Sequence, residues 1–97
     1  MREHNYYVYI LTNKSNRVLY IGMTDDLQRR MQEHKQRLDS SSFASRYNLT
    51  KLVWYEYTHD VAGAIQREKQ LKNWRRQWKF ALIEEKNKGW KDLSEEW

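Results

Sequence analysis

The fold of this chain is decided by residues 6–22, which read YYVYILTNKSNRVLYIG. Tyr6–Leu11 and Val18–Ile21 are rich in β-branched and aromatic side chains, and such runs favour β-strands. The segment between them, Asn13–Asn16, consists of residues that favour turns. The stretch therefore predicts an antiparallel hairpin with a four-residue loop.

The register of this hairpin determines which side chains share a face of the sheet. If the register is symmetric about the middle of the loop, Tyr9 lies opposite Tyr20 and the two form a cross-strand pair. Gly22 comes directly after the second strand. A glycine at this place either lets the chain bend or lets another group come close to the backbone.

Beyond the hairpin, helical and extended patterns follow one another. Thr24 offers a capping hydroxyl and is followed by two aspartates, which is typical of a helix start. This first helix is expected to run to about Leu38. Residues 39–48 are mostly polar and predict a loop. Leu52–Tyr57 predicts a third strand, which is expected to be the most buried of the three.

Two further helices are expected in the second half of the chain. Asp60 can cap a helix over Val61–Asn73, and a third helix is expected over Arg76–Lys86. The tail, residues 87–97, is acidic. A chain of 97 residues can build one modest core, so residues 1–97 are expected to form a single domain. The fold class is α/β of the α+β kind, with a small three-stranded antiparallel sheet flanked by about three helices.

The composition excludes several classes of protein and of site. The chain contains no cysteine, so disulfide partners, thiolate zinc sites and thiol nucleophiles are excluded. No apolar run is long enough for a signal peptide or a membrane span, and no membrane partner is expected. We therefore expect a cytoplasmic protein and favour a monomer.

Positive charge is concentrated in the middle of a chain whose net charge is +5. The segment Gln66–Lys79 holds six lysines and arginines against one acid, Glu68, with tryptophans between them. This mixture suits a polyanion, because phosphates meet the cations and bases stack on the rings. The alternative interpretation is a solvated helix face whose tryptophans point into the core.

Glu68 interrupts an apolar stripe on the second helix. The other members of the stripe are Val61, Ala64, Ile65 and Leu71. A carboxylate on an inward face is costly unless it is paired, protonated or bound to a metal. One interpretation is an ion pair with Lys72, one turn further on. The other is an oxygen ligand for Mg²⁺, which is commonly held by one or two carboxylates together with waters and substrate phosphate.

Arg30 and His34 are four residues apart on the first helix and flank its apolar stripe. Such a pair is often only a solvated surface feature. Phosphoryl chemistry, however, needs a planar cation against the charge that develops on the phosphate oxygens, and arginine supplies it. A tyrosine can act as general base only if nearby positive charge lowers its pKa from about 10.

These residues together follow the pattern of a known family. The pattern consists of Tyr7-Val8-Tyr9, Tyr20-Ile21-Gly22, Arg30, His34 and Glu68. It resembles the GIY-YIG nuclease superfamily, and most closely its small stand-alone bacterial members. The likeness covers the chain from Tyr6 to at least Trp74. There is one departure, because Tyr7 stands where the first motif has its name-giving glycine.

The resemblance implies an active site on one face of the sheet and metal-dependent cleavage of phosphodiester bonds, with Mg²⁺ or Mn²⁺ as cofactor. It implies that Glu68 is the metal ligand and that a tyrosine, preferably Tyr9, takes the proton from the attacking water. Arg30 would stabilise the charge of the transition state, and His34 would orient the water or relay its proton. The full set of catalytic residues implied is Tyr9, Tyr20, Arg30, His34 and Glu68, and Asn87 is matched to a polar residue that some members carry late in the domain.

The expected function is that of an endonuclease acting on nucleic acid, DNA rather than RNA, with structured or single-stranded substrates and a place in repair or recombination. The residues expected to hold the nucleic acid are Arg46, Arg67, Lys72, Arg75 and Arg76. Two alternatives stay open at this point. One is a nucleic-acid-binding module without cleavage, and the other is a protein-interaction domain that uses exposed tryptophans.

Overall fold

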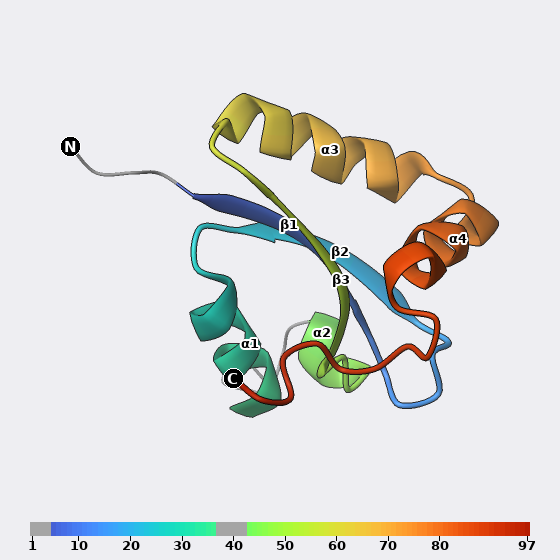
Figure 1. The fold of residues 1–97 in the computed structure, drawn as a ribbon. Coiled ribbons are helices and arrows are strands. Elements are labelled where there is room, and N and C mark those ends of the chain that lie inside the picture. The colour runs from blue at the N-terminus through green and yellow to red at the C-terminus, as the bar shows by residue number, and fades with distance from the viewer. Residues whose placement is uncertain (1–4, 37–42) are drawn as a thin grey trace.

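The computed structural model describes residues 5–36 and 43–97, whose arrangement is shown in Figure 1. Three strands, β1 (Tyr6–Thr12), β2 (Leu19–Thr24) and β3 (Lys51–Thr58), form one sheet. The strand order is β2-β1-β3, and both pairings are antiparallel. The α+β fold with a three-stranded antiparallel sheet is thereby confirmed.

The helices agree with the sequence pattern most closely in the second half of the chain. Helices α3 (Val61–Asn73) and α4 (Arg76–Lys86) begin and end at the predicted residues. Helix α1 spans Leu27–Gln36, and its predicted end at Leu38 lies outside the described residues. The short helix α2 (Phe43–Arg46) forms where the sequence predicted only a loop.

Helices cover both faces of the sheet (Figure 1). Val8 and Ile10 of β1 share a core with Ala64 and Leu71 of α3 and with residues from α4 and the tail. The other face of β1 packs against α1 through a second core. The members of this second core are Tyr9, Leu11, Leu27, Met31, Leu49 and Leu52. The chain is therefore a three-layer arrangement in which β1 touches both cores.

Strand β1, and not β3, is the most buried strand. Residues 8–12 of β1 are all buried, whereas Tyr55, Glu56 and Tyr57 of β3 are exposed. The prediction for β3 was wrong because burial follows the position in the sheet. β1 has a neighbour on each side, and β3 is an edge strand whose second half is not covered.

The hairpin register differs by two residues from the symmetric one. Tyr9 pairs with Gly22, and Tyr20 pairs with Leu11. The connection is longer than predicted because Asn13 closes it, with its side-chain oxygen accepting a hydrogen bond from the Arg17 amide at 3.0 Å. A shift of two residues leaves every side chain on its original face. Tyr9 and Tyr20 therefore still share a face, as diagonal neighbours with ring centroids 6.3 Å apart.

The start of α1 is capped by Asp26 and not by Thr24. The Asp26 carboxylate accepts a hydrogen bond from the Arg29 amide at 3.1 Å, as an N-cap side chain does. Thr24 is the last residue of β2, and its hydroxyl accepts a hydrogen bond from the Asp26 amide at 3.1 Å. The two residues together turn the chain from the edge strand into the helix.

The tail is fastened to β3 by a buried side chain. Asn87 donates hydrogen bonds to the carbonyls of Val53, at 3.1 Å, and Lys91, at 2.9 Å. The Leu93 amide donates to the Leu52 carbonyl at 2.7 Å. Asn87 thus has a structural role in closing the domain. Within residues 5–36 and 43–97, no helix has the length and apolar character that a membrane crossing requires.

Candidate active site

The side chain of Tyr9 lies directly over the backbone of Gly22. A Cβ atom at position 22 would lie 2.4 Å from Cζ and 2.5 Å from Oη of Tyr9. Neither separation is possible between real atoms, so the phenol ring occupies the place that any side chain at position 22 would need. Gly22 therefore allows the close approach of a neighbouring group, one of the two roles its place in the sequence suggested. It does not end the strand, because β2 continues to Thr24.

Three rings meet above this glycine. Tyr9 and Tyr20 project from the sheet, and His34 comes down from α1 to complete a triangle. The His34 ring centroid lies 6.3 Å from that of Tyr9 and 6.3 Å from that of Tyr20. The structure thus brings together Tyr9, Tyr20 and His34, three of the residues that the sequence singled out.

Two polar atoms in this cluster are buried and have no hydrogen-bond partner in the part of the chain that the structure describes. They are Oη of Tyr9 and Nε2 of His34. A buried polar group without a partner costs on the order of 1–3 kcal/mol of stability, and folded proteins contain few of them. Each such atom in a native structure calls for an explanation, such as a catalytic role or a bound ion or water.

The pKa of Tyr9 is raised well above its ordinary value. Burial is the largest cause, and the neighbouring Tyr20 and the Glu68 carboxylate add to it. The guanidinium of Arg30 acts in the opposite direction. Because no hydrogen bond of normal geometry joins Arg30 to the Tyr9 hydroxyl, Arg30 acts on this pKa through its positive charge. Tyr9 consequently keeps its proton at neutral pH and can donate a hydrogen bond.

The pKa of His34 is lowered below its ordinary value. Burial is again the largest cause, the positive charge of Arg30 adds to it, and Glu33 opposes it. His34 is therefore neutral at neutral pH. In the tautomer that carries its proton on Nδ1, the lone pair of the unpartnered Nε2 is free to accept a proton.

Glu68 approaches the cluster from the other side of the sheet. Ala64 and Leu71 of α3 are fully buried against the sheet, and the Glu68 side chain is 23% exposed. Val61 and Ile65, predicted to face inward, are exposed by 43% and 38%. The inward stripe of α3 is therefore narrower than predicted, and Glu68 lies on its flank.

The expected ion pair between Glu68 and Lys72 is present. The ammonium nitrogen of Lys72 lies 3.6 Å from Oε2 of Glu68, and the Lys72 side chain is 54% exposed. An exposed pair at this separation is worth little free energy and is easily broken by a competing cation. The pairing and a role as metal ligand are thus compatible.

The elements that carry the candidate residues lie on both faces of the sheet. Tyr9, Tyr20, Arg30 and His34 belong to the α1 side. Glu68 belongs to α3, which packs over β1 and β2 from the opposite side. β2 is an edge strand, so groups from the two sides can meet around it. The Glu68 charge makes the smallest of the contributions to the raised pKa of Tyr9.

The donor atoms suit a hard cation that keeps most of its waters. Among the described residues no group of three or more histidine, cysteine, aspartate or glutamate side chains is arranged to hold a metal. One carboxylate, Glu68, stands near the phenol oxygen of Tyr9. Mg²⁺ is commonly bound in this way, by one or two carboxylates with water and phosphate oxygens in the other positions. A zinc site, with three or four protein ligands, does not fit.

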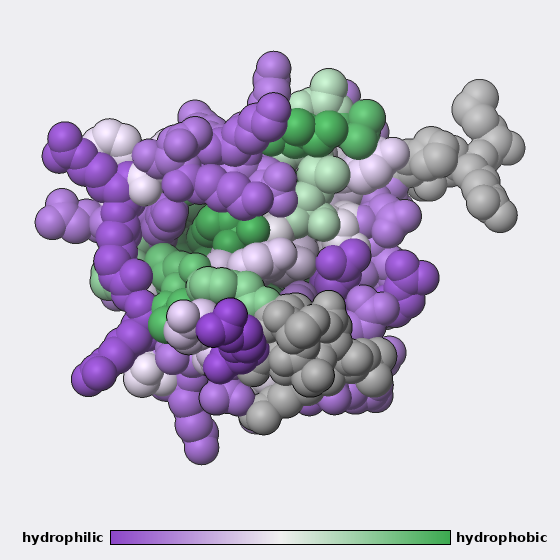
Figure 2. Space-filling view, turned by 180° about the vertical axis from the view of Figure 1, so that it is seen from behind, coloured by the Kyte–Doolittle hydropathy of each residue, from purple (hydrophilic) through white to green (hydrophobic). Residues whose placement is uncertain are grey.

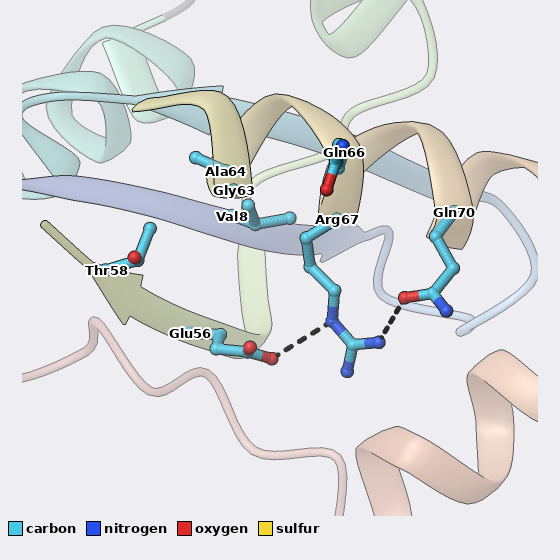
Figure 3. A pocket seen from close by; sticks show the side chains of 8 residues that line it. All are labelled: Val8, Glu56, Thr58, Gly63, Ala64, Gln66, Arg67 and Gln70. Atoms are coloured by element: carbon cyan, nitrogen blue, oxygen red, sulfur yellow. Dashed lines mark hydrogen bonds and ion pairs between the residues drawn. The ribbon is translucent and has the colours of Figure 1, made fainter. Parts of the chain in front are cut away.

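The basic residues expected to hold nucleic acid do not share one surface. Arg67 lies on the β3 flank of α3, where it pairs with Glu56 at 3.2 Å and donates to Gln70 at 2.6 Å (Figure 3). Positions 67 and 68 are about 100° apart around a helix, so Arg67 and Glu68 point to different flanks. Lys72 is on the side of Glu68. Arg67 therefore faces away from the candidate active site.

The remaining basic residues are partly engaged by aromatic rings. The guanidinium of Arg75 lies 5.6 Å from the ring of Trp78, and that of Arg76 lies 4.8 Å from the ring of Phe80. Arg76 also donates to the carbonyl of Arg17 in the hairpin loop. Trp78 is 51% exposed, so the alternative interpretation, in which the tryptophans point into the core, does not hold for it.

Phe43 and Tyr47 extend the aromatic cluster outward, which the sequence did not predict. Phe43 stacks on Tyr20 with centroids 6.1 Å apart and planes inclined by 27°, and Tyr47 lies 4.6 Å from Phe43. Both are exposed, by 47% and 43%, and Arg46 lies between them in sequence and is exposed. The spacing of two aromatic residues four apart was the available signal. Figure 2 shows one face of the molecule, with apolar residues gathered over its middle and hydrophilic residues around them.

Comparisons with known proteins agree with this arrangement. The family model described as the GIY-YIG catalytic domain matches residues 5–81. A UPF0213 protein of Syntrophus aciditrophicus is 34% identical over 79 residues, which cover 81% of this chain and 90% of that protein. A UPF0213 protein of Bacillus pumilus is 33% identical over 85 residues, 88% of this chain and 85% of that protein.

A solved structure has the same fold. The solution NMR structure of the UPF0213 protein BH0048 from Bacillus halodurans superimposes with a TM-score of 0.58 at 26% identity. The alignment covers 91% of this chain and 92% of that chain. The likeness therefore extends over most of the chain.

Proposed function

This chain belongs to the family of GIY-YIG catalytic domains, a nuclease superfamily, and from that membership we propose that it is a divalent-metal-dependent endonuclease that hydrolyses phosphodiester bonds in DNA. The observation that carries the proposal is the pair of unpartnered buried atoms, Oη of Tyr9 and Nε2 of His34. The Arg30 charge acts on the pKa of both groups, and the Glu68 charge acts on that of Tyr9. A phosphodiester with an attacking water supplies the partners that both atoms lack.

In the reaction proposed, water attacks the phosphorus and the bond to the leaving oxygen breaks. Arg30 faces the phosphate and stabilises the negative charge that builds on its oxygens. Its charge-assisted hydrogen bonds to phosphate can replace the pair with Glu33, in which Nε lies 3.3 Å from Oε1. That pair is about 40% exposed on both sides, so breaking it costs little.

The proton of the attacking water goes to His34 in this mechanism, and Tyr9 acts as a hydrogen-bond donor. Tyr9 is not proposed as the base, because burial raises the pKa of its hydroxyl and makes a phenolate unfavourable there. Burial lowers the pKa of His34, so the imidazole is unprotonated and ready at neutral pH. Tyr20 holds the other side of the triangle and keeps the ring of His34 oriented.

Glu68 is proposed to hold Mg²⁺ or Mn²⁺. A divalent ion bound there would supply positive charge to the phosphate and to the leaving oxygen. Glu68 is suited to the task because its present partner, Lys72, is an exposed side chain that can turn away. The carboxylate would exchange one cation for another without leaving a buried charge unpaired.

The aromatic ladder formed by Tyr20, Phe43 and Tyr47 supports substrates with unpaired bases. Its rings are stacked or tilted at centroid separations of 6.1 and 4.6 Å, and its outer members are exposed. Base-on-ring stacking holds single strands without regard to sequence, and the adjacent Arg46 can meet the phosphates. We therefore place single-stranded or branched DNA ahead of intact duplex as the substrate, in a repair or recombination setting. Lys72, Arg75 and Arg76 are proposed as further phosphate contacts.

A cleavage assay on single-stranded, flapped, branched and duplex DNA of one sequence tests the proposal. Cleavage is expected with Mg²⁺ or Mn²⁺, and none with a chelator. The Glu68→Gln variant, matched to the wild-type in fold by circular dichroism, is expected to be inactive. Salt-sensitive binding without cleavage in any metal would instead support a nucleic-acid-binding module, and the absence of both would leave protein interaction as the better assignment.

A further inference from the structure

An aromatic pocket of about 350 Å³ lies on the flank of α1 that faces away from the candidate active site. Gln28 of α1 lines it, whereas Arg30 and His34 project from the other flank of the same helix. The walls of the pocket come from β1, β3 and the tail. Its aromatic members are Tyr7, Tyr55 and Trp97.

The three rings stand at steep angles to one another. Tyr7 and Tyr55 have centroids 6.3 Å apart and planes inclined by 64°. Tyr55 and Trp97 have centroids 6.0 Å apart and planes inclined by 69°. Tyr55 is 42% exposed and Trp97 is 48% exposed, so their surfaces remain accessible. The electron-rich faces of exposed aromatic rings attract a cation.

The charged residues that line the pocket are acids. Asp25 and Asp26 stand at its α1 side, and both are exposed. The start of α1 contributes only about half a positive charge, which the two carboxylates outweigh. No lysine or arginine is among its described lining residues, although the chain as a whole carries a net charge of +5. A phosphate would be repelled here, so this pocket is not part of the proposed DNA path.

We propose that this pocket binds an organic cation of the alkylammonium class. The methyl or methylene groups of the guest contact the rings of Tyr55 and Trp97, and its positive charge is balanced by Asp25 and Asp26. One oxygen of Asp26 accepts from the Arg29 amide, which leaves the other oxygen for the guest. The activity is independent of the nuclease proposal, since the two sites share no side chain.

Titration of the full chain with choline, followed by NMR and calorimetry, tests the proposal. Saturable binding of choline is expected, with chemical-shift changes centred on Tyr55 and Trp97. The neutral isostere 3,3-dimethyl-1-butanol has the same shape without the charge and should bind at least tenfold more weakly, because it lacks the cation–π and carboxylate contacts. Equal binding of the two probes, or no saturable binding of choline, would overturn the assignment.

Variants locate the binding site. Trp97→Ala is expected to weaken choline binding roughly tenfold through loss of one ring. Asp25→Asn with Asp26→Asn should weaken it at least as much, and asparagine preserves the cap of α1. Trp78→Ala is the matched control, since Trp78 is 51% exposed on α4 and should leave choline binding unchanged. If a trimethyllysine peptide binds more tightly than choline, the natural guest is a methylated lysine of a protein partner. If choline binds more tightly, the natural guest is a free metabolite.

Discussion

Replacing Gly22 with alanine is the most direct test of how the site is built. The added methyl group would meet Cζ of Tyr9 at 2.4 Å and Cε1 of Tyr20 at 2.9 Å. Ordinary van der Waals contact begins near 3.4 Å, so the Tyr9 ring must move by about 1 Å. Tyr9 is fully buried and cannot move without disturbing its neighbours. Overpacking of this kind costs roughly 1–3 kcal/mol of the free energy of unfolding.

The same substitution at Gly63 is the control. Gly63 lies inside α3, and a methyl group there would meet the Asp60 carboxylate at 3.2 Å, at the end of a flexible side chain. Alanine is favoured over glycine in a helix by about 1 kcal/mol. Gly63→Ala is therefore expected to be neutral or stabilising. The two glycine-to-alanine changes should shift stability in opposite directions.

Urea denaturation of the single variants and of a double variant measures the effect. In a Tyr9→Ala background the ring is absent, and Gly22→Ala should then cost nothing or fill part of the space. Single-turnover cleavage should fall in Gly22→Ala, because the displaced Tyr9 hydroxyl no longer meets the substrate. Equal stability changes for Gly22→Ala and Gly63→Ala would refute the reasoning, since Tyr9 would then not lie across β2.

Three further predictions concern the remaining site residues. Arg30→Ala should reduce the single-turnover cleavage rate about 10²–10³-fold, and Arg30→Lys should restore little of it. Arg29→Ala, at the preceding position of the same helix, is the control and should be tolerated. Equal small effects at both positions would place the site elsewhere. Glu68→Gln should abolish metal-dependent cleavage and leave the urea midpoint nearly unchanged, because its partner Lys72 is exposed and lies 3.6 Å away. An unfolded variant would assign Glu68 a structural role. Because the pKa of His34 is lowered on folding, the unfolded chain binds more protons than the folded chain as the pH falls below 6.5. The stability of the wild type should therefore be full above pH 6.5 and fall below it, and the stability of His34→Phe should fall less steeply. Parallel stability profiles would contradict the burial of His34.

Helix α4 matches its predicted bounds although its N-cap residue, Arg75, makes no side-chain hydrogen bond to the helix. Helix α3 could be predicted to the residue because its start is encoded locally. Asp60 caps α3 by accepting a hydrogen bond from the Ala62 amide at 3.0 Å, and this pattern is visible in the sequence. Helix α2 has only four residues, and Phe43 packs on Tyr20, a contact between distant parts of the chain. An isolated helix of that length is not stable, so no local pattern could reveal it.

The hairpin shows which part of the candidate site could be derived from the sequence. Alternation along the strands gave the shared face of Tyr9 and Tyr20 correctly, since it survives a register shift of two. The shift itself depends on Asn13, and on Asn16 with φ of 59°, which together lengthen the connection. The meeting of Glu68 with Tyr9 could not be derived either, because it depends on how α3 lies across the sheet edge.

Because the candidate site is divided between two layers, it is complete only when both layers have folded. The α1 layer carries the rings and Arg30, and the proposed metal ligand arrives only with residue 68, on a helix that packs against the other core. During synthesis, a chain that has reached residue 60 contains all three strands but does not yet contain Glu68. Partial opening of either layer in the finished protein separates the same groups. A nuclease of the proposed kind would therefore be inactive as a nascent chain and would lose its activity when either layer begins to unfold.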